Sequence, residues 1–286
     1  MKTSIECFPC LVRQIVYTVR QFFNTPQEQE ETARYLLNMI SEEDLRQPPP
    51  MIVSDLHREI RNRLDDPDPF AEIKHNSNAM ALEWYGELKA LISKSPDPFL
   101  TAVRVAIAGN IIDYGLKGNV ESEQVQRCVE QALSADIDQQ SIEEFHTKAE
   151  SAETILYLAD NAGEIVFDRL LIEQLSPERA TVAVKGKPVL NDATIEDARQ
   201  IGLTEIVRVV DTGTDILGTH IDSCPNEVRE LIESADLVIS KGQANYELLS
   251  DVSREITFLF LLKCPLVAKR LNRPEGSYIV YNKDRD

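Results

Sequence analysis

The sequence has few basic residues for its length and no long apolar run. It contains 48 Asp and Glu against 30 Lys and Arg, which gives a formal net charge of -18. This charge opposes long-range attraction to DNA, RNA or an anionic bilayer. The longest apolar run, ITFLFLL at 256–262, is too short to cross a membrane, and MKTSIECFPC lacks the apolar core of a signal peptide. We therefore expect a cytoplasmic protein with neither a nucleic-acid partner nor a membrane partner.

Cysteines are also few, and their number argues against a disulfide scaffold. There are five in 286 residues, of which 43% are hydrophobic, so the chain can fill a core without covalent links. Cys7 and Cys10 form a CxxC, which is typical of a zinc site or a redox dithiol when further partners are present. Cys264 could supply a third thiolate if the fold brought the two ends of the chain together. Otherwise the pair is interpreted as packed or weakly reactive thiols.

Signature motifs of several enzyme classes are absent from the sequence. No GxGxxG follows a predicted strand, and GxxxxGK[ST], HExxH and GxSxG do not occur. Nicotinamide-dependent, P-loop, zincin and α/β-hydrolase functions therefore lose their main support. The four histidines are scattered and lack the spacing of metal ligands.

The periodicity of apolar residues changes near residue 150. Before it, they recur at helical spacing, and the prolines at 48–50 are predicted to end the second helix. After it, six short runs alternate with helical patterns: TILYLAD, ATVAVK, EIVRVV, DLVISKG, ITFLFLL and SYIVYN. Runs that are apolar at their centres are typical of parallel strands covered on both faces. We predict an α/β fold with a helical N-terminal domain, residues 1–150, packed on a doubly wound, mostly parallel sheet domain, residues 151–286.

Polar residues follow the predicted strands, at the edge of the sheet where ligands bind in such folds. Asp160 and Asn161 follow the first run, Asp192 lies beyond the second, and lysines follow the fourth and fifth. Carboxylates and carboxamides suit a divalent cation such as Mg or Mn, while lysines and glycine amides suit a phosphate. The combination indicates metal-assisted phosphoryl chemistry in the cleft between the two domains. Each of these residues alone is also compatible with a turn or a helix N-cap.

Several motifs occur in the order found in a known family. They are ECFPC, DPFAEIKHNSNAMAL, AIAGNIIDYG, YLADNAGEIVFDRLLIE, NDATIEDA, SKGQANYE and LLKCPLVA, and they extend from Glu6 to Ala268. Together they resemble the damage-control phosphatase family related to acidic-residue methyltransferase 1, formerly domain of unknown function 89, and the CxxC resembles its archaeal and bacterial branch. The resemblance implies a metal-dependent phosphatase of small phosphorylated metabolites, such as sugar phosphates or damaged phosphometabolites. It also implies a divalent Mn, Mg, Co or Ni ion as cofactor.

The resemblance further implies roles for individual residues. Asp160, Asn161 and Asp192 match the metal ligands of the family, and Glu164 matches the acid that follows the Asp-Asn pair. Asp160 and Asn161 are expected to take part in catalysis together with Lys263, which matches the phosphate-binding lysine of the family. The eukaryotic branch carries Arg-Thr-x-Lys there, whereas this chain reads FLLKCP, so only the lysine corresponds.

Further residues are expected to contact the substrate besides Glu164. Lys241, Gly242 and Asn245 match the substrate-contacting Lys-Gly-x-x-Asn segment of the family. Asn110 and Asp113 lie three residues apart on one face of a predicted helix, where they either line the cleft or form a polar helix end.

Two functions of other classes stay open. One is S-adenosylmethionine-dependent carboxyl methylation, an activity that has been associated with the family, although no glycine-rich loop follows the first strand. The other is non-catalytic binding of a metal and a phosphometabolite, which needs the same ligands. For the phosphatase, attack on phosphorus by water and attack by Asp160 are both compatible with the sequence, which also leaves the oligomeric state open.

Overall fold

The computed structural model describes residues 1–109 and 122–284, with side chains from residue 127 onward in the second range. The helices before the first strand are α1 (Phe8–Phe22), α2 (Pro26–Glu42), α3 (Pro49–Leu64), α4 (Ala71–Lys94), α5 (Pro98–Gly109), α7 (Ser122–Ser134) and α8 (Gln139–Ser151). None of the helices in these ranges is both long enough and apolar enough to cross a membrane.

The three consecutive prolines begin a helix, whereas the sequence analysis predicted that they end one. Helix α2 ends at Glu42, before the prolines, and α3 has Pro48 as its N-cap with prolines in its first turn. Proline is favoured there because its missing N–H has no partner in the first turn of any helix. The prediction was wrong because proline excludes only the interior of a helix.

Six strands form one sheet in the order β3-β2-β1-β4-β5-β6. They are β1 (Ile155–Leu158), β2 (Ala180–Val184), β3 (Arg208–Asp211), β4 (Leu237–Lys241), β5 (Ile256–Leu261) and β6 (Tyr278–Lys283). Strands β1 to β5 are parallel, and β6 pairs antiparallel with β5. The helices between them are α9 (Glu164–Gln174), α10 (Ile195–Gln200), α11 (Asn226–Ser234), α12 (Gln243–Leu249) and α13 (Pro265–Leu271). The predicted α/β class with a mostly parallel sheet is confirmed.

The sheet is covered on both faces, as its apolar strands require. Ile155 and Tyr157 of β1 belong to a core that also contains side chains of α4, α5, α8 and α9. Leu156 and Leu158 point to the other face, where they pack with α11, α12 and α13. Helices α4, α5 and α8 therefore share a core with the sheet, although they precede residue 150.

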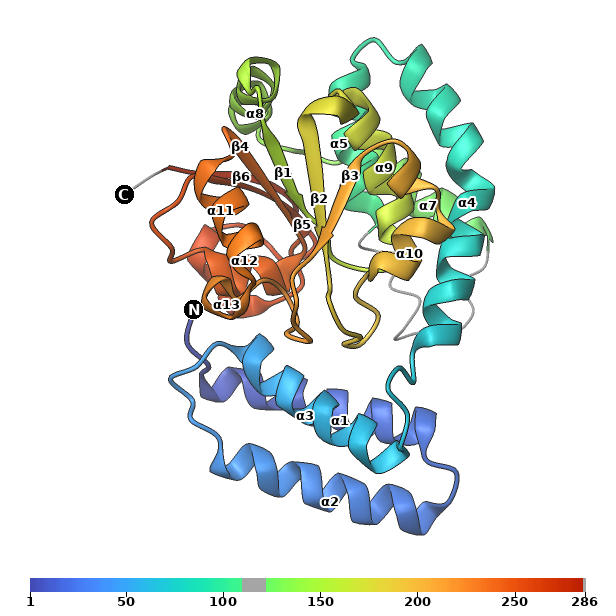
Figure 1. The fold of residues 1–286 in the computed structure, drawn as a ribbon, viewed down its shortest axis with the longest axis vertical. Coiled ribbons are helices and arrows are strands. Elements are labelled where there is room, and N and C mark those ends of the chain that lie inside the picture. Colours follow the sequence, from blue (N-terminus) through green and yellow to red (C-terminus); the bar gives the residue numbers. More distant parts are fainter. Residues whose placement is uncertain (110–121, 285–286) are drawn as a thin grey trace.

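Helices α1, α2 and α3 form a layer with a core of its own, which includes Leu11, Ile15, Leu36, Ile40 and Leu56. Figure 1 shows this layer in blue, facing the edge of the sheet from which the loops after β2 and β3 emerge. These loops follow the carboxyl ends of their strands, so the α1–α3 layer covers the edge at which the site is predicted.

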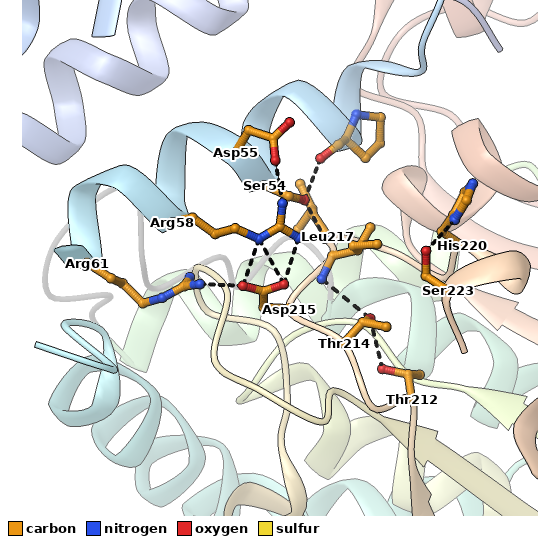
Figure 2. Close-up of polar contacts among 12 residues, drawn as sticks. Ser54, Asp55, Arg58, Arg61, Thr212, Thr214, Asp215, Leu217, His220 and Ser223 are labelled. Carbon is orange, nitrogen blue, oxygen red and sulfur yellow. Dashed lines mark hydrogen bonds and ion pairs between the residues drawn. The ribbon is translucent and has the colours of Figure 1, made fainter. Parts of the chain in front are cut away.

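A polar cluster joins α3 to the loop after β3 (Figure 2). Arg58 donates hydrogen bonds to both carboxylate oxygens of Asp215 at 2.7–3.0 Å, and Arg61 donates to Asp215 Oδ2 at 2.6 Å. Ser54 Oγ accepts a hydrogen bond from the backbone N–H of Leu217 at 2.9 Å. These contacts hold the α1–α3 layer over the carboxyl edge of the sheet.

We predict that Asp215→Asn weakens this attachment in a pH-dependent way. Burial raises the pKa of Asp215, but Arg58 and Arg61 outweigh it and hold the pKa below its ordinary value. A carboxylate with a lowered pKa in the folded state stabilises the protein above its ordinary pKa, and this contribution is lost as the pH falls through the lowered value. At pH 7 the free energy of unfolding, measured in urea, should fall by about 1 kcal/mol, and the difference from wild type should vanish in acid. Asp222→Asn, which changes an exposed acid nearby, should have no such effect, and equal losses in both variants would contradict the assignment.

Candidate active site

The crevice expected in a doubly wound sheet lies between β1 and β4. From β1 the chain proceeds to β2 and β3 on one side, and it then crosses to β4 on the other. Ligands bind beyond the carboxyl ends of the strands at such a reversal. Asp160 follows β1 and Gly242 follows β4, and they lie so close that a Cβ atom on Gly242 would be 1.9 Å from Oδ2 of Asp160. The predicted Asp-Asn pair therefore lies at the crevice.

A short β-bridge brings Asp192 to the same place. It pairs Asn161 with Asp192 in antiparallel fashion, and the backbone N–H of Ala193 donates to the carbonyl of Asp160 at 2.8 Å. Leu190, two residues before Asp192, has a φ of 47°, which is uncommon for a residue other than glycine. The three residues predicted to bind metal thus meet, although they come from different loops.

The site concentrates negative charge away from water. Asp160 is 6% exposed, and Glu164 and Asp192 are fully buried. Burial, together with the charges of Asp192 and Glu164, raises the pKa of Asp160 well above its usual range. Burial also raises the pKa of Asp192 to about 6, although Lys185 opposes the shift. Buried carboxylates at such close range are costly unless positive charge lies beside them.

The donor atoms fit a hard divalent cation. Both carboxylate oxygens of Asp192 are buried, and within the described ranges neither makes a hydrogen bond of ordinary geometry, although the ammonium of Lys185 lies 3.4 Å from Oδ2. Asn161 directs its Nδ2 to Asp160 Oδ2 at 2.7 Å and to Glu164 Oε2 at 3.1 Å, which turns its Oδ1 away from both acids. No group of three His, Cys, Asp or Glu side chains in the described part of the chain is arranged to hold a metal. A cation at this site would therefore need the Asn161 oxygen in addition to Asp160 and Asp192, and oxygen donors of this kind suit Mg or Mn.

Lys185 is a site residue that the sequence analysis missed. It follows β2 directly, it is 2% exposed, and its ammonium lies 3.4 Å from Oδ2 of Asp192. The same ammonium donates to the backbone carbonyl of Gly218 in the loop after β3. The lysine that ends the run ATVAVK was the available signal, because it follows a strand just as Lys241 does.

Asn78 was also missed, because its role depends on a contact across the fold. It is fully buried in α4, its Oδ1 accepts a hydrogen bond from the N–H of Gly163 at 2.7 Å, and its Nδ2 donates to Asp197 at 2.9 Å. Gly163, with a φ of 78°, makes the turn from Asn161 into α9. Asn78 therefore fixes the loop that carries the Asp-Asn pair. It lies within a motif that carried the family resemblance, but its residue type alone indicated no role.

Lys241 is buried rather than open to the crevice. Its ammonium donates to the carbonyl of Ala106 at 3.0 Å, to Glu164 Oε1 at 2.6 Å and to Asp168 Oδ1. Burial lowers the pKa of Lys241, but the charges of Asp168 and Glu164 outweigh it and raise the pKa above its usual value. The three N–H groups of the ammonium thus all meet protein acceptors.

The remaining predicted residues differ in exposure. Asn245 is fully buried, and its Nδ2 donates to the carbonyls of Lys241 at 2.7 Å and Ala159 at 3.3 Å, so it ties the carboxyl ends of β4 and β1 together. Lys263 is exposed just after β5, and its backbone N–H donates to the side chain of Gln243 at 3.1 Å. Asn110 and Asp113 lie outside the described residues.

The cysteines of the CxxC face different surroundings. Cys7 is buried, whereas Cys10 is exposed and accepts a hydrogen bond from Arg13 at 3.4 Å. Cys264 is partly buried, and the N-terminal ammonium of Met1 donates a hydrogen bond to the carbonyl of Glu247 at 2.6 Å, so the N-terminus does approach the C-terminal part of the chain.

Comparison with known proteins places the chain in a family. The family model for the damage-control phosphatase ARMT1-like domain matches residues 3–279. A damage-control phosphatase of Archaeoglobus fulgidus is 34% identical and is covered over 98% of both chains. One of Pyrococcus horikoshii is 33% identical over 98% of this chain and 97% of its own length. The crystal structure of a DUF89 family protein from Pyrococcus horikoshii has a TM-score of 0.86 and 32% identity over 99% of both chains. The chain therefore belongs to the damage-control phosphatase ARMT1-like family, as its motifs predicted.

Proposed function

We propose that this protein is a metal-dependent phosphatase that hydrolyses phosphomonoesters of small metabolites, such as sugar phosphates or damaged phosphometabolites. The observation that carries the proposal is the meeting of Asp160, Asn161 and Asp192 at one β-bridge. The buried carboxylate of Asp192 faces the ammonium of Lys185 at 3.4 Å and makes no hydrogen bond of ordinary geometry in the described part of the chain. The phosphatase names of the relatives support the reaction type.

The three ligand residues would hold a Mn, Mg, Co or Ni ion. A divalent cation bound there would polarise a phosphoryl oxygen and offset the charge of the acids. The protein itself contributes the orientation of the donors, because the β-bridge and the hydrogen bonds of Asn161 hold them in place. Groups held in advance at the place where charge develops need no reorganisation during the reaction.

Lys263 is our candidate for binding the phosphate. It is exposed, and it follows β5, the neighbour of β4 in the sheet, so it lies on the same edge as Asp160 and Gly242. A lysine at this position would neutralise the growing charge on the phosphoryl oxygens. Lys185 contributes positive charge beside Asp192 on the other side of β1.

A screen of phosphorylated metabolites with Mg, Mn, Co or Ni tests the function directly. We expect phosphate release from at least one substrate, loss of release with a chelator, and recovery when metal is restored. Product formation that requires S-adenosylmethionine would instead support the methyltransferase alternative. Binding of metal and phosphometabolite without release from any substrate would support the non-catalytic alternative.

We predict that Asp192→Asn and Lys263→Ala affect different ligands. Asp192→Asn removes a charge from the cation site while nearly keeping the shape of the side chain, so affinity for Mn should fall by about tenfold or more, and excess Mn should partly restore the rate. Lys263→Ala should raise KM and lower kcat while leaving Mn affinity unchanged, since its charge would face the phosphate. Calorimetric titration with Mn, combined with steady-state kinetics, separates the two effects. Full activity in both folded variants would contradict the proposed site.

We also predict that Gly242→Ala abolishes Mn binding and activity. The added Cβ would lie 1.9 Å from Oδ2 of Asp160, so the carboxylate would have to move. Gly276→Ala is the matched control, because Gly276 also has a positive φ, 84° against 78° for Gly242, yet nothing lies within 4 Å of its added Cβ. Both variants should lose some stability to backbone strain, but only Gly242→Ala should lose Mn affinity. Equal Mn affinity in the two variants would show that the close approach is unimportant.

A further inference from the structure

A row of buried polar side chains leads from the core to Asn161. Tyr157 donates a hydrogen bond to Asp168 Oδ1 at 2.9 Å, and Lys241 donates to the same oxygen. Lys241 also donates to Glu164 Oε1 at 2.6 Å, and Glu164 Oε2 accepts from Asn161 Nδ2 at 3.1 Å. Tyr157, Asp168, Lys241 and Glu164 are all fully buried. Burying such an array of charged and polar groups costs folding free energy. Its connection to Asn161 therefore raises the question of how it contributes to the site.

We propose that Glu164 and Lys241 are positioning residues that set the orientation of the Asn161 carboxamide, and that neither of them contacts the substrate. This inference rests on the proposed function in one respect, because only that function makes Asn161 a ligand of a cation. It differs from the expectation drawn from the family resemblance, which assigned both residues to the substrate.

The orientation follows from hydrogen-bond chemistry. A carboxamide has a donor end and an acceptor end, which exchange places when it rotates by half a turn. A carboxylate only accepts, and Asn161 faces two of them, Asp160 Oδ2 at 2.7 Å and Glu164 Oε2 at 3.1 Å. Its Nδ2 must therefore point to these acids, since the opposite orientation would place Oδ1 against negative oxygens. The oxygen of Asn161 is thereby left for a cation.

Lys241 holds Glu164 in the position from which Glu164 Oε2 accepts the hydrogen bond of Asn161 Nδ2. It binds Oε1 and so leaves Oε2 for Asn161. Its other two acceptors lie on rigid helices, the carbonyl of Ala106 in α5 and Asp168 in α9. Removing a residue that hydrogen-bonds to a metal ligand typically lowers metal affinity by about 10–100-fold.

The key variant is Glu164→Gln, which keeps the shape of the side chain but has only one oxygen. Lys241 can only donate, so it takes that oxygen and leaves the glutamine nitrogen facing Asn161 Nδ2. Two donors cannot bond to each other, and Asn161 loses this partner. We expect the dissociation constant for Mn, measured by calorimetric titration of the whole protein, to rise by about tenfold. In the double variant with Lys241→Met, the glutamine oxygen is free to turn to Asn161, and part of the affinity should return.

The variant Asp168→Asn distinguishes an effect on the orientation of Asn161 from a general effect of removing negative charge on Mn affinity. It removes the same charge from the same buried array, but the hydrogen bonds of Asp168 are to Lys241 and Tyr157, whereas Glu164 bonds to Asn161 directly. Positioning predicts Mn affinity within about twofold of wild type. A loss equal to that of Glu164→Gln would overturn the proposal in favour of charge alone, and so would unchanged affinity in Glu164→Gln.

A measurement on the wild-type protein tests the orientation of Asn161 without metal or substrate, and a variant is needed only to assign the signals. The side-chain amide resonances of Asn161, assigned by their absence from the spectrum of Asn161→Asp, should show slow exchange with water at both protons, because each is held by an acid. Exchange as fast as in a free carboxamide would overturn the proposal. This measurement needs neither metal nor substrate, so failure of wild type to bind Mn or release phosphate would refute the proposed function and leave the positioning result to be judged separately.

Discussion

The packing of three carboxyl groups into the crevice between β1 and β4 is the constraint on which the rest of the site depends. Asp160, Asp192 and Glu164 are buried at the carboxyl edge of the sheet, where charges of the same sign repel each other with little screening by water. Two buried lysines offset part of this charge: Lys185 beside Asp192 and Lys241 beside Glu164. Under the proposed function a divalent cation would supply the rest, so an arrangement that is costly for the folded chain alone would become favourable with the ion bound.

The surrounding elements hold these charges in place. The β-bridge between Asn161 and Asp192 joins two loops, and Asn78 fixes the turn at Gly163 from the opposite layer. The α1–α3 layer reaches the site through the loop after β3, which binds Ser54 and Arg58 on one side and, through the carbonyl of Gly218, Lys185 on the other. The site is therefore supported from α4 and from the α1–α3 layer, whereas the proposed metal ligands come from the sheet edge alone.

The sequence predicted the sheet well, and it also predicted that Asp160, Asn161 and Asp192 would lie at one edge of that sheet, because both expectations follow from local patterns. Apolar runs identified all six strands, and polar residues after them identified the edge. The role of the three prolines at 48–50 was predicted wrongly because a proline is compatible with the first turn of a helix as well as with a break. Asn78 was missed because its role depends on Gly163, which is distant in sequence. Lys185 lies close to Asp192 in sequence and was overlooked, although it ends an apolar run just before the loop that carries Asp192. The expected substrate role of Lys241 was inferred from a motif, which does not reveal that Glu164 and Asp168 already occupy its ammonium.

The strand order also has a consequence for how the chain folds. β1 can form its ladder with β4 only after β2, β3 and their helices have been synthesised, since Ile155 pairs with Leu237. Loop closure must be completed before such non-local contacts stabilise the chain, which makes parallel pairing of this kind slow. Asp160 and Gly242 meet only across this pairing, so a partly folded chain that contains β1, β2 and β3 would have the Asp-Asn turn but not the closed crevice. The complete ligand site is thus a property of the finished fold, and a bound ion would slow the unfolding of the native state without speeding the early steps of folding.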